Sequence, residues 1–262
     1  MIYKYYPSNN YTYEALEEGY FYFNKVSRQN DPFDASFKLL QANFLLDELK
    51  RKGLPDNTEN IMKDYAACSF SHLKDNKHMW TFYAKDYFGL VIGFDEEQFL
   101  HYQNKFQTRI PLLEVNYVEK PITDDDLSDS FELRFPLEDK LSYRYTQCFT
   151  DEKALEALFY LICCMKEKAT WSMEKELRLI AALDVLNNQN RLTKLGFKYS
   201  DNGYKIPIPP NCVKEIILGH NFSNENILRI KNIAKKYGIK EIQQTKLGMP
   251  FEMEFEKINI EE

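Results

Sequence analysis

Two glutamates and an arginine alternate within residues 171–178, where Glu174, Glu176 and Arg178 occupy every second position. Side chains two positions apart lie on the same face of a strand, so this spacing predicts that the three share one face. A carboxylate held beside a packed sheet can stabilise a developing positive charge or move a proton. The same residues also suit an exposed strand edge with ordinary ion pairs. Both uses stay open on this segment alone.

Polar and aromatic residues in four other segments are candidates to complete a site with the glutamates. Each segment also has a simpler explanation: a solvent-facing lysine, a turn fixed by proline, small residues filling a strand, or core aromatic side chains. The candidate contacts for a ligand are Lys4, Tyr5, Asn30, Asp31, Asp34, Ser69, Ser71, Trp80, Tyr83 and Arg178.

The elements that must position these residues are predicted from periodicity and turn residues. We expect strands at residues 2–6, 20–23, 66–71, 89–94, 112–118, 213–218 and 239–245, with a strand following Glu176. Helices are expected at residues 13–18, 37–51, 77–87, 151–168 and 225–237. Strands outnumber long helices and do not alternate with them, which predicts an α+β fold of mixed, largely antiparallel sheets with flanking helices. We expect one domain over residues 1–262, with a possible insertion at 119–147 and a frayed tail at 253–262.

The composition narrows the classes of function. A formal net charge of −6 gives no attraction for nucleic acid, and the basic residues form no long run. Only 9 glycines occur and no Gly-rich phosphate loop is present, which weighs against kinases, P-loop enzymes and Rossmann dehydrogenases. Five cysteines without a C-x-x-C pair, no signal peptide and no long apolar run predict a cytoplasmic protein outside the membrane.

The candidate segments together resemble a bacterial family of unknown function, numbered twenty-nine seventy-one among such domains. The resemblance rests on Lys-Tyr near the N-terminus, Asn-Asp-Pro-Phe-Asp at residues 30–34, Cys-x-Ser, Met-Trp-x-x-Tyr and Trp-x-x-Glu-x-Glu-x-Arg. It spans residues 3–178, with a weaker match at residues 216–219. This family implies no activity.

A more distant resemblance, to toxin-type ADP-ribosyltransferases, implies a mechanism. Those enzymes carry a basic residue on an early strand, then a serine-containing strand, then Glu-x-Glu leading into a late strand; here Lys4, Ser69 and Glu176 follow that order. The resemblance implies NAD as substrate, with Lys4 on its phosphates or ribose and Ser69 bracing the nicotinamide pocket. Glu176 would stabilise the ribose cation, and Glu174 would position or deprotonate an unknown acceptor. Trp80 or Tyr83 would stack on nicotinamide. A role as a bacterial toxin or anti-phage effector follows from the same likeness.

Lysine departs from the arginine or histidine common at the first position, so Arg178 is an alternative phosphate contact. Two other functions also remain open. Asp31, Asp34 and the two glutamates could gather around Mg²⁺ in a nuclease. Alternatively, Glu174, Glu176 and Arg178 form structural ion pairs in a non-enzymatic interaction or sensor module. The four histidines are scattered, so a zinc hydrolase is not favoured.

Overall fold

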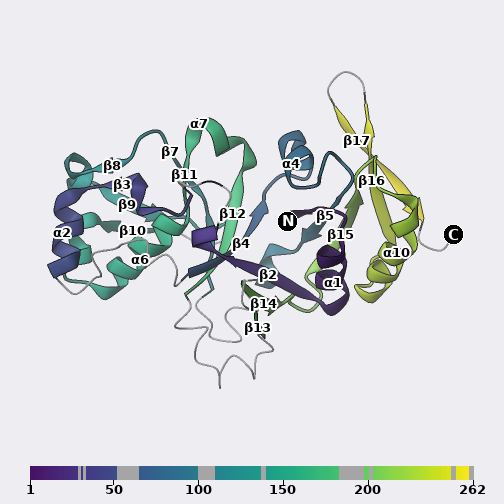
Figure 1. The fold of residues 1–262 in the computed structure, drawn as a ribbon, viewed down its shortest axis with the longest axis horizontal. Coiled ribbons are helices and arrows are strands. Elements are labelled where there is room, and N and C mark those ends of the chain that lie inside the picture. The colour runs from purple at the N-terminus through teal and green to yellow at the C-terminus, as the bar shows by residue number, and fades with distance from the viewer. Residues whose placement is uncertain are drawn as a thin grey trace.

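The chain folds into one large sheet with helices and smaller sheets around it, an α+β architecture, in a computed structural model (Figure 1). The structure describes residues 1–28, 31, 34–51, 65–99, 110–136, 140–182, 198–200, 203–248 and 252–259. As predicted, the sheet is largely antiparallel: among its described strand pairs, β15 with β16 is the one parallel pair.

The strands that the structure describes are β1 (Ile2–Tyr6), β2 (Tyr20–Lys25), β3 (Leu40–Gln41), β4 (Tyr65–Ser71), β5 (Leu90–Phe94), β6 (Leu112–Glu114), β7 (Asn116–Val118), β8 (Ile122–Thr123), β9 (Ser130–Leu133), β10 (Leu141–Arg144), β11 (Met165–Glu167), β12 (Glu176–Ala182), β13 (Lys198–Ser200), β14 (Gly203–Pro207), β15 (Val213–Leu218), β16 (Glu241–Leu247) and β17 (Met253–Asn259). The α-helices are α1 (Asn10–Glu18), α2 (Asn43–Arg51), α4 (Lys77–Phe82), α6 (Glu152–Cys163), α7 (Lys168–Trp171) and α10 (Ile227–Lys236). Short 3₁₀ turns include η5 (Ser172–Glu174).

The large sheet forks at β4. One edge of β4 pairs with β12 along its whole length, from Tyr65 opposite Ala182 to Ser71 opposite Glu176. The other edge is shared: Ala66 and Ala67 pair with β2, whereas Ser71 pairs with Tyr3 of β1. From the fork, β2 leads to β14 and β13, while β1 leads through β5 and β15 to β16 and β17. The fork places β12, β4 and β1 side by side (Figure 1).

Side-chain alternation along β4 and β12 divides the core between the two faces of the sheet. Phe70 and Leu177 pack on one face in a cluster rich in phenylalanine, where Phe21, Phe94 and Phe99 also lie. Ala67 and Ile180 face the other side, toward α6, α2 and β9. These last elements form the part at the left of Figure 1. Each strand therefore presents apolar residues to both sides for most of its length, which leaves few positions for polar side chains.

Several predicted boundaries were wrong for reasons visible in the strand pairing. The helix predicted at 151–168 ends at Cys163, because Met165–Glu167 pairs in parallel with β7. The helix predicted at 37–51 begins only at Asn43, after a 3₁₀ turn and β3. The helix predicted at 77–87 ends at Phe82, and positive φ angles follow at Lys85, Asp86 and Tyr87.

Two further predicted segments also differ. The strand predicted at 112–118 is split at Val115, so that β6 pairs with β12 and β7 with β11. Instead of a frayed tail, residues Met253–Asn259 form β17, fully paired with β16. The segment 119–147 contains β9 and β10 and contributes Phe131 to the second core cluster. Among the described residues, no helix is long and apolar enough to cross a membrane.

Candidate functional site

Glu176 and Arg178 lie on one face of β12, as their spacing predicts, and directly beside the two serines of β4. Glu176 is the cross-strand neighbour of Ser71, and Arg178 is the neighbour of Ser69. The face is buried: Arg178 is 0% exposed and Glu176 is 4% exposed. The expectation that the alternating charges form a solvated strand edge is therefore wrong. A buried charge must be paired, so its partners define the site.

Glu174 is not on the strand, yet its carboxylate joins the same cluster. It ends the η5 turn, and the next residue, Lys175, takes a left-handed conformation with φ 46° that reverses the chain before β12 begins. The end of β4 and the residue after it fix this turn: the Ser71 hydroxyl donates to the Glu174 carbonyl at 2.7 Å, and the His72 N–H donates to the Lys175 carbonyl at 3.1 Å. Ser71 therefore acts through the backbone, and the Lys175 side chain is exposed.

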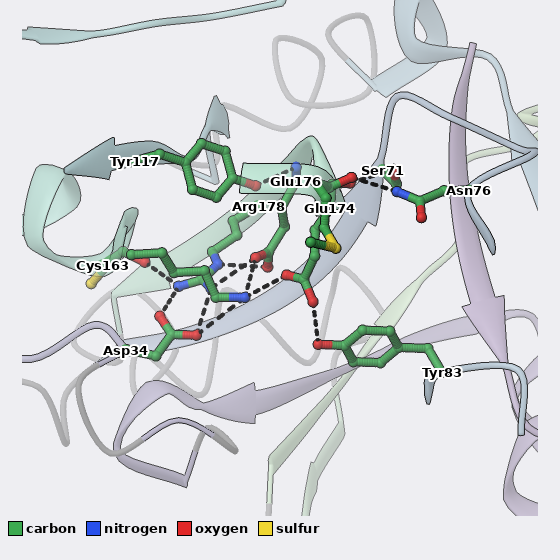
Figure 2. Close-up of polar contacts among 11 residues, drawn as sticks. Asp34, Ser71, Asn76, Tyr83, Tyr117, Cys163, Glu174, Glu176 and Arg178 are labelled. Atoms are coloured by element: carbon green, nitrogen blue, oxygen red, sulfur yellow. Dashed lines mark hydrogen bonds and ion pairs between the residues drawn. The ribbon is translucent and has the colours of Figure 1, made fainter. Parts of the chain in front are cut away.

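Arg178 uses all five of its N–H groups inside the protein. Two parallel bonds join Nη1 and Nη2 to the Asp34 carboxylate at 2.6 and 2.7 Å. Two more join Nε and Nη2 to the Glu176 carboxylate at 2.8 and 3.0 Å, and Nη1 also donates to the Cys163 carbonyl. Figure 2 shows Asp34 and Glu176 on either side of the guanidinium. No donor remains for a phosphate, and Arg178 does not line the cavity described below.

Lys166 is the second cation of the cluster. Its ammonium lies 2.7 Å from Oε2 of both Glu174 and Glu176, and 3.7 Å from the Asp34 carboxylate. Burial lowers the pKa of Lys166, but the neighbouring carboxylates outweigh that effect and raise it overall. The ammonium also lies 4.8 Å from the centre of the Trp171 ring, within range of a cation–π interaction. Lys166 therefore stays charged and binds the two glutamates together.

The cluster carries an unbalanced negative charge. Three carboxylates (Asp34, Glu174 and Glu176) face two cations (Lys166 and Arg178), a formal charge of −1 when all five are ionised. Burial by itself would raise the pKa of Glu176, yet Arg178 and Lys166 overcome it and lower this pKa to about 2. Glu176 is consequently a carboxylate at any physiological pH.

Two tyrosines complete the polar contacts of the cluster (Figure 2). The Tyr83 hydroxyl, from the segment after α4, donates to Glu174 Oε1 at 2.7 Å. Burial and the nearby carboxylates raise the pKa of Tyr83, so this hydroxyl keeps its proton. The Tyr117 hydroxyl accepts the backbone N–H of Glu176 at 2.9 Å, where β6 has ended and supplies no ladder partner. Glu174 thus has one neutral and one cationic partner, whereas Glu176 has two cationic partners.

A cavity of about 90 Å³ opens beside the cluster. This volume is smaller than the roughly 300–1,000 Å³ of most small-molecule sites, so it suits one ring or one sugar rather than a whole dinucleotide. Its lining is Tyr3, Lys4, Tyr5, Asp31, Asp34, Ser69, Phe70, Met79, Tyr83, Lys166, Trp171, Glu174 and Glu176. Eight of the twelve sequence-predicted site residues are among them, and these come from five separate segments of the chain.

Lys4 lies at this cavity, but its ammonium group points to the opposite face of the sheet from Glu176. Tyr3 pairs with Ser71, so Tyr3 and Tyr5 share the face of Ser71 and Glu176, and Lys4 between them faces the other way. Its ammonium donates to the Ser69 carbonyl at 2.9 Å and lies 5.3 Å from the Phe70 ring centre. The structure therefore gives no support to a phosphate contact by Lys4 beside Glu176.

The remaining predicted contacts divide between core and cavity. Trp80 is fully buried, stacks on Tyr87 and donates its indole N–H to the Lys74 carbonyl, so it does not line the cavity. Tyr5 lines the cavity, and its hydroxyl donates to the Leu73 carbonyl. Ser69 and Asp31 also line it. Asn30 lies outside the described residues.

Five lining residues were not predicted as site residues from the sequence: Tyr3, Phe70, Met79, Lys166 and Trp171. Tyr3 had a readable signal, because it alternates with Lys4 and so shares a face with Tyr5. Lys166 had none, since it fell within a predicted helix. The cations that contact the two glutamates are consequently Lys166 and Arg178, and not Lys4 as the transferase resemblance implied.

No family model, curated protein or solved structure matches this chain. Both resemblances drawn from the sequence, to the bacterial family and to toxin-type ADP-ribosyltransferases, therefore stay predictions. Inference about activity has to come from the geometry of the cluster and its cavity.

Proposed function

We propose that this chain cleaves the bond between nicotinamide and ribose in NAD and transfers the ADP-ribose to an acceptor. The observation that carries the proposal is the charge of the cluster: Glu176 is held ionised by Arg178 and Lys166, and three carboxylates face two cations beside a cavity lined by aromatic rings. The nicotinamide of NAD is a flat pyridinium cation. Aromatic faces and a nearby carboxylate are the groups that favour such a cation.

The chemistry would follow from the distribution of charge. When the ribose–nitrogen bond breaks, its electron pair goes to the nicotinamide nitrogen and the positive charge moves to the ribose. The fixed Glu176 carboxylate lowers this barrier, because it is in place before the charge develops. The acceptor then bonds to the ribose carbon and loses a proton, for which Glu174 is the nearby carboxylate. Tyr83 and Lys166 hold Glu174 in position.

The fold supports the same proposal through one adjacency. The three segments named by the transferase resemblance, around Lys4, Ser69 and Glu176, belong to β1, β4 and β12, which are neighbours in the sheet. Because the cavity is small, only the nicotinamide end of NAD would enter it, and the phosphates would lie outside. We place the activity in a reducing cytoplasm, in keeping with the free thiols of Cys68, Cys148, Cys163, Cys164 and Cys212, and assign it to a toxin or defence effector.

A non-enzymatic module is the second candidate, and one observation favours it. Arg178 is satisfied entirely by internal partners, as expected for structural ion pairs. A Mg²⁺ nuclease is not proposed. The Lys166 ammonium lies among Asp34, Glu174 and Glu176, where the metal would have to bind. The described residues include no group of three or more His, Cys, Asp or Glu side chains placed to hold a metal ion.

The test is release of nicotinamide from labelled NAD by the wild type and by Glu176→Gln. We expect the variant to lose at least about 100-fold in rate, as when a single charge-stabilising group is removed. Glu119→Gln, an exposed glutamate paired with Lys168, is the matched control and should keep the wild-type rate. Production of the wild type in a bacterial host should slow growth, and Glu176→Gln should relieve that effect. A wild type that leaves NAD intact, together with a Glu176→Gln variant that loses only stability, would establish the interaction module instead.

A further inference from the structure

A second, larger pocket lies at the edge of β4 that faces away from β12, in the fork between β1 and β2. Its volume is about 580 Å³, within the roughly 300–1,000 Å³ of sites that hold small molecules. It is bounded by β1, β2, β14 and α1, at the place where β1 and β2 diverge from β4. Tyrosines form much of its wall: Tyr6, Tyr11, Tyr20 and Tyr22. Of the described lining residues, Lys4 alone belongs to both this pocket and the cavity beside Glu176.

Lys4 is the unbalanced charge of this pocket. It is half-buried, and its side chain lies on the face of β1 that carries Tyr6, 5.5 Å from the centre of that ring. The Lys4 ammonium donates a hydrogen bond to the Ser69 carbonyl. Ser69 lies on β4 between Ala67, which pairs with β2, and Ser71, which pairs with β1. Within the part of the chain that the structure describes, no carboxylate pairs with it. A partly desolvated ammonium without a counter-ion favours an anionic ligand.

The other cation of the pocket is already neutralised. Lys205 donates to Glu14 at 2.6 Å and lies 3.6 Å from Glu18. The Tyr20 hydroxyl also donates to Glu14, and the Lys205 ammonium lies 4.3 Å from the Tyr20 ring centre. Among the residues that the structure describes, the pocket therefore combines one positive charge without a carboxylate partner, Lys4, with tyrosine rings that can contact a planar apolar ligand. These two features select the charge and the shape of the ligand separately.

From this arrangement we infer that the pocket is a binding site for a small aromatic acid: a planar ring that carries one carboxylate. The carboxylate binds the Lys4 ammonium through charge-assisted hydrogen bonds. The ring lies against Tyr6, Tyr20 and Tyr22. This site is separate from the proposed NAD reaction, since Lys4 faces away from Glu176.

Three probes with one ring system and different charges test the inference: 1-naphthoate, 1-naphthylmethanol and 1-naphthylmethylammonium. Dissociation constants are measured by titration calorimetry with the full chain. The naphthoate should bind at least about 10-fold more tightly than the alcohol, which corresponds to about 1.4 kcal/mol. The ammonium should bind least, because it carries the same charge as Lys4. Equal affinity for acid and alcohol, or no binding at millimolar concentration, would overturn the inference on the wild type alone.

Variants then locate the site. Lys4→Met should abolish the preference for acid over alcohol and leave binding of the alcohol unchanged. Lys74→Met is the matched control, because Lys74 also lies over an aromatic ring, Phe255, but pairs with Glu215 outside the pocket. Tyr22→Ala, at a partly exposed wall position, should weaken acid and alcohol alike and serves if Lys4→Met does not fold. Unchanged binding to Tyr22→Ala would show that the ligand sits elsewhere and would reject the site.

Discussion

Asp34 and Arg178 are joined by two parallel hydrogen bonds, although 144 positions separate them in the chain. The bonds measure 2.6 and 2.7 Å, and both side chains are at least nine-tenths buried. A planar guanidinium matches a carboxylate in this way, which lysine cannot reproduce. The pair links β12 to the segment that follows β2, and so it holds Asp34 in the cluster beside Glu176.

Loss of this pair should destabilise the protein strongly. Arg178→Met leaves the carboxylates of Asp34 and Glu176 buried with only Lys166 nearby, and breaking a buried pair costs about 3–5 kcal/mol. We expect a loss of that size in the free energy of unfolding, measured in urea. Arg178→Lys should recover only part of it, because the fork geometry is lost.

The control for this prediction is Arg229→Met. Arg229 also makes a two-bond pair, with Glu17, but both side chains are exposed. Solvent screens such a pair, so its removal should leave the unfolding midpoint nearly unchanged. A similar loss from both arginine variants would contradict a special role for the buried cluster.

The low pKa of Glu176 predicts how its contribution to stability depends on pH. Its pKa falls from 4.5 to about 2 on folding, so the ionised form is favoured in the folded state. The resulting stabilisation is fully present above the unfolded value of 4.5 and is lost as the pH falls toward 2. The difference in unfolding free energy between wild type and Glu176→Gln should therefore be constant near neutrality and shrink between pH 5 and 2. A difference that grows on acidification would show that Glu176 is protonated in the fold.

Lys166→Met should destabilise the protein and also change the titration of its neighbours. Without this ammonium, the two glutamates lose their shared cation, and the pKa of Glu176 should rise because Lys166 is one of the groups that lower it. We expect a loss of about 3 kcal/mol at pH 7 that diminishes in acid, where protonation relieves the repulsion. Urea unfolding at pH 7 and at pH 4 measures both effects.

Lys168→Met is the matched control, two residues along the chain. The Lys168 side chain is about half exposed and pairs with Glu119, itself 75% exposed. Its removal should have little effect at either pH. An equal response from the two lysine variants would mean that the three carboxylates do not depend on Lys166.

The sequence predicted those parts of the fold and site that follow from local periodicity. Alternation placed Glu176 and Arg178 on one face of a strand, and the apolar run after them ensured that the strand would be central. The same alternation in residues 2–6 already implied that Lys4 and Tyr5 face opposite sides, a conclusion that the resemblance to transferases obscured. Periodicity also favoured α+β correctly, because strand and helix patterns depend on neighbouring residues.

Contacts between distant segments were not readable. Asp34 meets Arg178 only because β4 and β12 pair in a particular register and the chain after β2 returns to them. Lys166 lies on β11, whose pairing with β7 ends a helix that its own sequence would continue. Glu174 joins the cluster through the left-handed Lys175, a conformation that favours glycine and gives no signal in a lysine. Tertiary structure decides each of these three cases.

Tyr83→Phe tests whether the position of Glu174 matters for the proposed reaction rather than for folding. The hydroxyl of Tyr83 donates to Glu174 Oε1 at 2.7 Å, and a hydrogen bond to a charged group contributes about 1.5–3 kcal/mol. If Glu174 takes the acceptor proton, loss of this hydrogen bond should lower kcat/KM for ADP-ribose transfer by about 10- to 100-fold. Hydrolysis of NAD, in which water takes the place of the acceptor and which relies on Glu176, should slow less.

Tyr87→Phe is the control, since Tyr87 stacks on Trp80 outside the cavity and should leave both rates unchanged. Equal losses in transfer and in hydrolysis from Tyr83→Phe would instead assign Glu174 to bond cleavage, together with Glu176.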